Sequence, residues 1–268
     1  MTIIDTIKLR KSVRSYSGKP LDTEDKEKIK NYIKSLPQPL NGKARIELIS
    51  LDTGPGAVKL GTYGVISGAK DYLILAYEQG DLSDQNAGYL FEQVVLYCTS
   101  LGLGTCWLGG TFKKSDFANQ ITLRSNEVLP IVSPVGYPEE KPRLLDRFMR
   151  AGAGSDKRKP FGKLFFNKDF DVELAEKSAG EYNIPLQMLR LAPSASNSQP
   201  WRLVLDGQQL HFYYIDKSSL SGIDLGIALC HFAEVCRESD IEGEFSVLEA
   251  GRYPSNSKLK YVISWTGK

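Results

Sequence analysis

The chain has 268 residues, 41% hydrophobic and 25% charged, which suffices for one large globular domain or two small ones. Its 34 Lys and Arg against 32 Asp and Glu leave a net charge of +2, and the basic residues form no tract, which argues against a nucleic-acid partner. The longest apolar stretches, such as residues 72–77, are much shorter than a membrane-spanning helix, so we expect no membrane partner.

Neither a secretory signal nor a metal site is expected. The first residues lack a basic start followed by an apolar stretch and a cleavage site, so we expect a cytoplasmic protein. The cysteines lack Cys-x-x-Cys spacing, and the histidines have no ligand-like neighbours. These residues are Cys98, Cys106, Cys230, Cys236, His211 and His231. We interpret all of them as core residues and expect no metal.

Helices and strands alternate along the whole chain, which predicts an α/β or α+β body. The first half is expected to contain helices beginning at Ile3 and Thr23, strands 45–51 and 71–77, a helix 86–101 and a strand 129–135. Thr23 or Asp25 is a candidate cap for the second helix. Helix 86–101 has apolar residues on more than one face, so we expect it to be central and buried.

The second half of the chain can be laid over the first, which indicates an internal duplication. The overlay equates strands 45–49 with 202–206, 72–77 with 210–215 and 129–136 with 259–266, and helix 86–101 with 222–236. Few residues are identical, so a chance match between two α/β halves stays an alternative. A true duplication makes the chain a dimer fused into one polypeptide, with the two helices in equivalent places.

Arg10-Lys-Ser-Val-Arg14 follows the first predicted helix. Two guanidinium groups and a hydroxyl group close together suit a phosphate, because arginine offers two parallel N–H donors and serine adds another. The alternative is a solvated helix end whose cations interact favourably with the helix dipole.

A polar loop lies at residues 192–201, Ala-Pro-Ser-Ala-Ser-Asn-Ser-Gln-Pro-Trp, directly before a predicted strand. Its two prolines restrict the backbone, and the serine, asparagine and glutamine side chains between them offer donors and acceptors suited to the edge of a heterocycle. An ordinary turn uses the same residue types. The ten-residue pattern is more specific than a turn requires.

The glycine-rich run at residues 101–110, Leu-Gly-Leu-Gly-Thr-Cys-Trp-Leu-Gly-Gly, follows the buried helix. Gly102 and Gly104 are explained equally well by the end of a helix. Gly109 and Gly110 instead allow the backbone to approach a planar ligand closely. The run is not the dinucleotide-binding G-x-G-x-x-G pattern, which follows a strand and begins a helix.

Together with the segment Leu-Pro-Ile-Val-Ser-Pro-Val-Gly-Tyr-Pro at 129–138, these motifs resemble the flavin-dependent nitroreductase family over most of the chain. The order differs, because the family carries its PSxxNxQ loop soon after the first Arg-Ser motif. The chain therefore looks like the subgroup with both halves of a dimer on one polypeptide. The resemblance implies an α+β nitroreductase-like fold, with two pseudo-symmetric α/β halves around central buried helices and sheets rich in antiparallel pairs.

The family implies FMN bound noncovalently at the junction of the halves. Carried over by motif, the phosphate would contact Arg10, Lys11, Ser12, Lys141 and Arg143, and the pyrimidine end would lie near Arg14. The reactive edge would receive backbone donors from the segment formed by Trp107, Leu108, Gly109 and Gly110. The second half would contribute Pro193, Ser194, Ala195, Asn197 and Gln199. The family chemistry demands no acidic or basic side chain, so no catalytic residue is named.

The expected division is residues 1–145 for the first half and 146–268 for the second, forming one compact pseudo-dimer. In the overlay, most motif residues of each half fall on different residue types in the other. Arg10 falls on Arg158, but Ser12 and Arg14 fall on Pro160 and Gly162. Leu40 replaces Asn197, and Phe245 replaces Trp107. All the losses belong to one site, so the overlay predicts one FMN per chain and no role for Arg158 in binding it.

The function implied by the resemblance is NAD(P)H-driven reduction of nitro compounds, quinones or similar small acceptors, by ping-pong hydride transfer through the flavin N5 atom. Two alternatives stay open. One is an FMN-binding carrier or sensor without turnover, and the other is a scaffold without cofactor that acts through protein contacts. The expected partners are NAD(P)H and a small acceptor, and the chain is expected to be a monomer.

Overall fold

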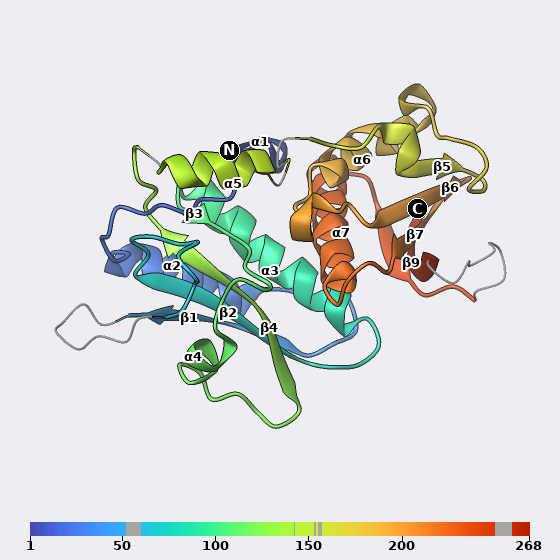
Figure 1. Cartoon of the computed structure of the whole chain (residues 1–268). Coiled ribbons are helices and arrows are strands. Elements are labelled where there is room, and N and C mark those ends of the chain that lie inside the picture. Colours follow the sequence, from blue (N-terminus) through green and yellow to red (C-terminus); the bar gives the residue numbers. More distant parts are fainter. Residues whose placement is uncertain (52–59, 142, 153, 155–156, 250–258) are drawn as a thin grey trace.

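The computed structural model describes residues 1–51, 60–141, 143–152, 154, 157–249 and 259–268. Two sheets flank a central pair of long helices, α3 and α7 (Figure 1). The first half comprises α1 (Ile3–Leu9), α2 (Thr23–Ser35), β1 (Ala44–Ser50), β2 (Asp71–Glu78), α3 (Ser83–Ser100), β3 (Gly104–Thr105), α4 (Lys114–Ala118), β4 (Glu127–Gly136) and α5 (Leu144–Gly152).

The second half begins with short elements and ends with a strand beside Gln209–Ile215. Its elements are η1 (Phe161–Lys163), β5 (Phe165–Asn167), η2 (Glu176–Ser178), η3 (Gly180–Tyr182), α6 (Asn183–Arg190), η4 (Ala195–Asn197), β6 (Trp201–Asp206), β7 (Gln209–Ile215), α7 (Ser221–Glu238), β8 (Gly243–Ser246) and β9 (Leu259–Gly267). Among the helices of the described ranges, none combines the length and apolarity needed to cross a membrane.

The two sheets share one topology. The strand order is β1-β2-β4-β3 in the first sheet and β5-β6-β7-β9-β8 in the second, so the second repeats the first and adds β5 at its edge. All the pairs are antiparallel except β5 with β6. This arrangement confirms the α+β fold with two pseudo-symmetric halves and antiparallel-rich sheets.

Both sheets also carry a β-bulge at the equivalent place. At the bulge, β4 has one residue more than β2, and β9 has one residue more than β7, which displaces the pairing locally. The pairs on either side of the bulge are Leu75–Ile131 and Tyr77–Val128 in the first sheet, and Phe212–Ile263 and Tyr213–Tyr261 in the second. The bulges therefore fix which residues of the two halves correspond.

The strand registers correct the sequence overlay for two of the three strand pairs. The overlay equated Leu75 with Tyr213, whereas the bulge equates Leu75 with Phe212. Leu75 and Phe212 both belong to clusters packed around the central helices, but Tyr213 belongs to a cluster on the other face of its sheet. A shift of one residue reverses the face of every side chain, so the overlay of 72–77 on 210–215 is wrong by one position.

Of the other two strand matches, one is wrong and one is correct. The match of 129–136 with 259–266 is wrong by two positions, because Ile131 corresponds to Ile263. The match of 45–49 with 202–206 agrees with the corrected register, since Arg45 pairs with Ala76 and Arg202 with Tyr213, the residue that now corresponds to Ala76.

The helices α3 and α7 cross where each carries a glycine. A Cβ atom at Gly88 would lie 2.2 Å from the Ile223 carbonyl oxygen, and one at Gly226 would lie 2.1 Å from the Gln85 carbonyl oxygen. The overlay equates Gly88 with Gly226 and Gln85 with Ile223, so one contact is the symmetry mate of the other. The prediction that these helices occupy equivalent, central places is confirmed.

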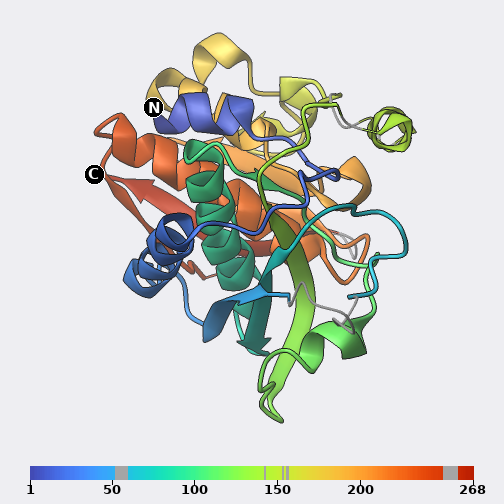
Figure 2. The ribbon, with the colours of Figure 1, turned by 90° about the vertical axis from the view of Figure 1, so that its left-hand side faces the viewer.

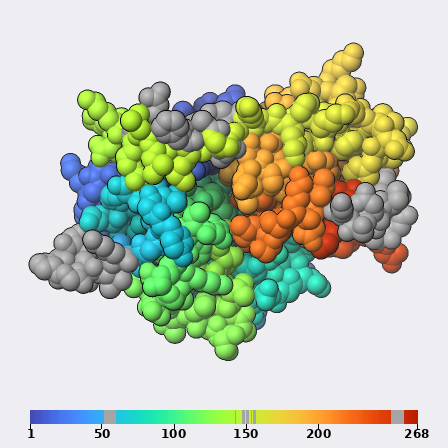
Figure 3. All heavy atoms as spheres, viewed as in Figure 1, coloured from blue at the N-terminus to red at the C-terminus, as the bar shows by residue number. Residues whose placement is uncertain are grey.

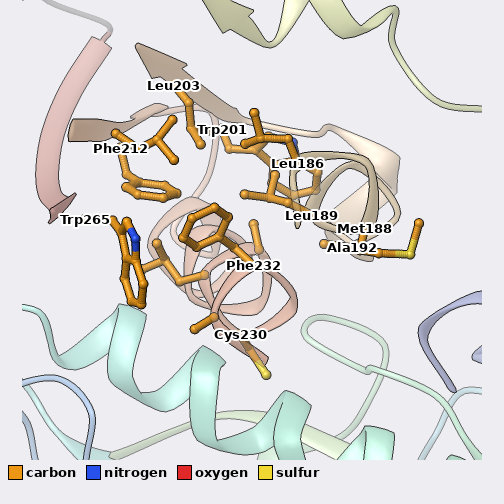
Figure 4. Packing of buried hydrophobic residues seen from close by; sticks show 14 of the residues in the cluster. Leu186, Met188, Leu189, Ala192, Trp201, Leu203, Phe212, Cys230, Phe232 and Trp265 are labelled. Carbon is orange, nitrogen blue, oxygen red and sulfur yellow. The ribbon is translucent and has the colours of Figure 1, made fainter. Parts of the chain in front are cut away.

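A large apolar cluster fills the space between α7 and the second sheet. Figure 4 shows Phe232 of α7 facing Trp201, Phe212 and Trp265 of the strands, while Leu186 of α6 approaches from the side. Trp201, Phe212 and Phe232 are fully buried. Burial of such aromatic side chains stabilises the fold by about 2 to 3 kcal/mol each. A smaller cluster around Phe91 supports the first sheet in the same way.

Helix boundaries differ from the sequence prediction at two places. The cap of α2 is Asp22, whose side chain accepts a hydrogen bond from the Asp25 N–H group, rather than Thr23 or Asp25. The helix expected from residue 86 already begins at Ser83. The division expected at residue 145 falls inside α5, which Figure 2 shows on the side of the molecule opposite α2. That division stays a prediction.

Candidate functional site

A cavity of about 550 Å³ lies between the two halves. Figure 3 shows the green segments of the first half meeting the orange segments of the second along the middle of one face. The first half contributes Arg10, Ser12, Arg14, Val65, Cys106, Trp107, Leu108, Gly109, Gly110, Thr111, Ile131 and Met149. The second half contributes Arg158, Pro193, Ser194, Ala195, Ser196, Asn197, Leu220, Ile223, Asp224 and Ile227.

The cavity brings together most of the residues singled out from the sequence. Those that line it are Arg10, Ser12, Arg14, Trp107, Leu108, Gly109, Gly110, Pro193, Ser194, Ala195 and Asn197. Those that do not line it are Lys11, Lys141, Arg143 and Gln199. Three segments that lie far apart in the chain therefore line the same cavity.

The basic segment at residues 10–14 is held in the cavity wall by backbone contacts. The Val13 N–H group donates to the Thr105 carbonyl oxygen at 2.8 Å, which places the segment beside β3. Gly104 leaves the space that this approach needs, because a Cβ atom there would lie 2.8 Å from the Val13 side chain. Arg14 Nε is buried, and no described residue offers it a hydrogen-bond partner.

A buried polar network, which sequence reasoning missed, lies behind this wall. Glu92 of α3 accepts a hydrogen bond from Trp107 Nε1 at 2.8 Å, and His231 Nε2 of α7 lies 2.9 Å from its other oxygen. Both side chains are fully buried. His231 Nδ1 lies 3.0 Å from the Met188 carbonyl oxygen, which only accepts, so Nδ1 donates to it.

The network connects two residues of the cavity wall. Arg10 Nε lies 3.9 Å from Glu92 Oε1, and the arginine side chain is only 9% exposed. The Trp107 ring packs edge-on against Phe91, with 4.8 Å between the ring centroids. Arg10 and Trp107 are therefore both fixed from behind by α3.

The run at residues 107–110 passes between the halves. Leu108 exchanges two backbone hydrogen bonds with Val132, at 2.9 and 3.1 Å, which tie the run to β4. A Cβ atom at Gly109 would lie 2.4 Å from Leu220 Cδ1 of the second half, so this position allows close packing of the halves. A Cβ atom at Gly110 would meet no atom within 4 Å, so this position opens onto the cavity.

The polar loop is strained and firmly held. Ser196, Asn197 and Gln199 have φ angles of 50°, 53° and 46°, which non-glycine residues rarely adopt. Asn197 Nδ2 donates to the carbonyl oxygens of Gly154 and Lys157 at 2.7 and 2.9 Å. Strain of this kind persists only where the surroundings enforce it, and it concentrates at functional sites.

Gln199 acts as an anchor beside the loop. It is 3% exposed, its Oε1 atom accepts from the Lys159 N–H group at 2.8 Å, and its own N–H group donates to Ser194 Oγ at 2.9 Å. Lys159 Nζ donates to the carbonyl oxygens of Ser198 and Gln199. Burial and the neighbouring Arg202 and Lys217 charges lower the pKa of Lys159 to about 8.

The three remaining basic candidates lie outside the cavity. Arg143 donates to Ser15 Oγ at 3.1 Å, to the Val65 carbonyl oxygen at 2.9 Å and to Asp146 at 3.0 Å. It thus joins the start of α5 to the segment that follows the basic motif. Lys11 and Lys141 are exposed.

Arg158 contradicts its sequence interpretation. The overlay treated it as a remnant of a second, lost site, yet it lines the same cavity as Arg10. Its terminal nitrogens donate to the carbonyl oxygens of Lys157 and Leu191, both at 3.0 Å. The segment before η1 therefore reaches back to the junction of the halves, and no role for Arg158 can be dismissed from the overlay.

Asp224, also missed from the sequence, lies in the first turn of α7 and lines the cavity. It is 4% exposed, and its two oxygens lie 3.0 and 3.2 Å from the Ala195 N–H donor. Burial raises the pKa of its carboxyl group to about 7. A composition-based reading gives no signal for it, because its chemistry arises from burial beside a loop distant in sequence.

The symmetry mate of Asp224 is Asn86, in the first turn of α3. Asn86 Nδ2 donates to Gln38 Oε1 and to the Gly42 carbonyl oxygen, at 3.2 and 3.3 Å, in the loop before β1. Each half thus ties the loop before its first repeated strand to the start of its central helix. The equivalent place in the first half is packed, because Leu40, the mate of Asn197, is 6% exposed and joins an apolar core cluster.

The comparisons with known proteins agree with this architecture. Residues 2–235 match the model of a family described as "Putative TM nitroreductase". A "putative nitroreductase" from Thermotoga maritima MSB8 has a similar structure, with a TM-score of 0.63 and 20% identity over 99% of this chain and 94% of that one. A comparison with curated proteins finds no match.

Two more distant structures resemble part of the chain. A nitroreductase family protein from Clostridium difficile 630 has a TM-score of 0.45 and 18% identity over 61% of this chain and 96% of its own. A nitroreductase with bound FMN from Bacteroides fragilis NCTC 9343 has a TM-score of 0.42 and 19% identity, covering 54% of this chain and 92% of its own. The family model extends over most of the residues, so the chain belongs to the nitroreductase family that this model describes.

Proposed function

We propose that the protein binds FMN in the cavity between its halves and uses it to reduce a small acceptor, such as a nitro compound or a quinone, with NAD(P)H. The observation that carries the proposal is the meeting of the basic segment at residues 10–14 with the polar loop at residues 193–197 around one cavity. No core packing requires this meeting, since both segments consist mainly of polar residues held by hydrogen bonds.

The residues present fit FMN in charge and shape. Arg10, Arg14 and Arg158 line the cavity against one acidic residue among the described lining, so the space favours an anionic ligand. The buried Arg14 Nε atom lacks a described partner and is available to a ligand. The open position at Gly110 admits a flat group against the backbone. The volume lies within the usual range of about 300 to 1,000 Å³ for small-molecule sites.

FMN, when bound, supplies the transfer of a hydride between nicotinamide and acceptor. Arg10 and Ser12 would hold its phosphate, and Arg14 would supply a fixed cation to the pyrimidine end, which stabilises developing negative charge. The Leu108 N–H group already donates to Val132, so the backbone N–H groups of Gly109 and Gly110 would be the donors available to the reactive edge. Asn197 and its neighbours would close the site from the second half.

Lys11, Lys141 and Arg143 take part less directly in this proposal. Arg143 positions the segment after the basic motif through Ser15 and Val65. Lys11 and Lys141, both exposed, add positive charge outside the cavity and favour the approach of anionic ligands. One FMN per chain follows, because the mate of the polar loop is packed with apolar side chains such as Leu40.

The test is an absorbance spectrum of the purified protein, before and after addition of FMN, followed by anaerobic titration with NADH and NADPH. We expect a bound-flavin spectrum that bleaches with at least one nicotinamide and returns when menadione is added. A flavin that stays oxidised with both nicotinamides would indicate a carrier or sensor. A protein that binds no FMN would remove the proposal altogether.

A further inference from the structure

One acidic group faces the proposed flavin site. Among the described residues that line the cavity, Asp224 is the acidic one. It is almost completely buried, and neither of its oxygens is paired with a cation in the described part of the chain. Its described backbone partner is the Ala195 N–H group, which lies within hydrogen-bond distance of both oxygens.

Holding the loop does not require an ionisable side chain. The mate of Asp224 is Asn86, which ties the corresponding loop of the first half to α3 with an amide group. An amide at position 224 would still offer an oxygen to the Ala195 N–H group. The half that contributes its polar loop to the cavity therefore carries a carboxyl group where an amide suffices elsewhere.

The surroundings leave this carboxyl group able to exchange a proton near neutral pH. Burial raises its pKa to about 7, while the Ala195 N–H group and the Ser198 side chain oppose the rise. The charged side chains that share the cavity with it are Arg10, Arg14 and Arg158, and Asp84 of α3 packs against Gly222, two residues before it. A group whose pKa lies near the working pH is well suited to general acid catalysis.

We propose that Asp224 is a catalytic acid of this oxidoreductase and gives a proton to the oxygen of the bound acceptor as that acceptor is reduced. The inference rests on the proposed function. A quinone gains two electrons and one proton as a hydride from the reduced FMN, and its oxygen gains a second proton from Asp224. The O–H bond of Asp224 breaks, a new O–H bond forms on the product, and the carboxylate regains its proton from water.

Its two oxygens allow Asp224 to do this without releasing the loop. Both oxygens lie within hydrogen-bond distance of the Ala195 N–H group, so either one can keep that hydrogen bond while the other carries the proton. Proton donation and loop anchoring then act together, because the carboxylate formed by the transfer is a stronger acceptor for that N–H group.

The experiment compares wild type with Asp224→Asn by anaerobic stopped-flow measurements on the FMN-loaded protein. We expect the rate of flavin reoxidation by menadione to fall about 100-fold, the scale of general acid catalysis, while flavin reduction by NAD(P)H and FMN affinity change little. In wild type the reoxidation rate should decrease as the pH rises through about 7, and Asp224→Asn should show no such decrease. Asp224→Glu should restore the dependence.

A second measurement does not depend on turnover. The absorbance of bound, oxidised FMN should show a transition near neutral pH in wild type, caused by the charge on Asp224, and none in Asp224→Asn. The matched control is Asp216→Asn, which removes an exposed carboxyl group that pairs with Lys260 outside the cavity wall. This control should leave both the reoxidation rate and the transition unchanged.

Equal reoxidation rates in wild type and Asp224→Asn would overturn the inference. If Asp224→Asn does not fold, the wild-type protein alone tests the inference. A reoxidation rate that does not change with pH, together with no spectral transition, overturns the inference. A rate and a spectrum that both change at the same pH near 7 support it. Failure of the proposed function looks different. In that case wild type would not bind FMN or would not be reduced by nicotinamide.

Discussion

Arg14 offers the sharpest test of the cavity at the level of one side chain. Its buried Nε atom lacks a described partner, so a ligand phosphate or carbonyl group would be its first strong acceptor. We expect Arg14→Ala to weaken FMN binding by about 1 to 3 kcal/mol, the usual loss for a charge-assisted hydrogen bond, as measured by flavin fluorescence titration. Arg124→Ala, at a side chain that is 66% exposed, is the control. Equal affinities in both variants would refute this assignment.

The same titration decides the role of Arg158. Its place in the cavity wall reverses the prediction from the overlay, so Arg158→Ala should weaken FMN binding in the same direction as Arg10→Ala. An unchanged affinity in Arg158→Ala would restore the interpretation of this residue as a remnant.

The Glu92–His231 pair predicts a strongly non-additive pattern of stability. His231→Leu leaves a fully buried carboxylate with one partner fewer, which should cost about 3 to 5 kcal/mol in the free energy of unfolding. Adding Glu92→Leu should recover part of this loss, because the mate of Glu92 is Cys230, a buried residue without charge. Urea unfolding of the single and double variants measures both terms. Losses that simply add would contradict the pairing.

Asp224 should make stability depend on pH in a definite direction. Burial raises its pKa from about 4 in the unfolded chain to about 7, so the folded state binds the proton more tightly. Stability from this group is therefore complete below about pH 4 and is lost as the pH rises to about 7, by on the order of a few kcal/mol. In thermal unfolding of the protein without FMN, the stability of Asp224→Asn relative to wild type should be higher at pH 8 than at pH 4. Parallel pH profiles would contradict this direction.

A functional residue can be found from sequence when its neighbours in the chain form an unusual pattern, but not when its properties come from burial against a distant segment. The motifs around Arg10, Trp107 and Asn197 are unusual within a few consecutive residues, and the structure brings them to one cavity. Glu92 and Asp224 lie in ordinary helical sequence, and their properties come from burial against a distant segment. No local pattern marks such residues.

At the level of elements, the crossing of α3 and α7 depends on two glycines. A methyl group at either Gly88 or Gly226 would meet a carbonyl oxygen at little more than 2 Å. We expect Gly88→Ala and Gly226→Ala each to destabilise the protein by about 1 to 3 kcal/mol or more, because backbone must move apart. Gly80→Ala, where a Cβ atom meets nothing within 4 Å, should change urea unfolding little. A harmless Gly88→Ala would mean that the helices have room to separate.

The strands show why an overlay by sequence finds the elements but not their register. Residues 71–77 of β2 are all buried, so the strand has no polar face to mark its orientation. A run of apolar residues matches another run equally well after a shift of one position. Only the bulges and the pairing partners distinguish the two alignments.

For the whole molecule, the arrangement predicts one FMN per chain. The cavity has its basic segment from one half and its polar loop from the other, and the mate of that loop is filled by Leu40 and Tyr89 in an apolar cluster. Titration of the protein with FMN should saturate at one equivalent, and light scattering should give the mass of a single chain. Saturation at two equivalents would refute the single-site arrangement.

The two pseudo-symmetric halves were accessible from sequence because helix 86–101 and its mate share an unusual pattern of apolar faces. The division at residue 145 and the cytoplasmic location stay predictions. The path of the segment between the halves was not accessible, since α5 and the residues after it carry no repeated pattern, and this is why Arg158 was assigned to the wrong site.

The meeting point of the long helices has a consequence for how such a protein can change. At Gly88 and Gly226 the backbone of one helix packs directly against the backbone of the other, so this contact does not depend on side chains. The other equivalent positions of the two helices can therefore carry different residues. Glu92 is equivalent to Cys230, and Asp224 is equivalent to Asn86. When two such halves lie on one chain, one half can acquire the residues of a site while the other keeps only a structural role. Two identical subunits encoded by one gene cannot diverge in this way.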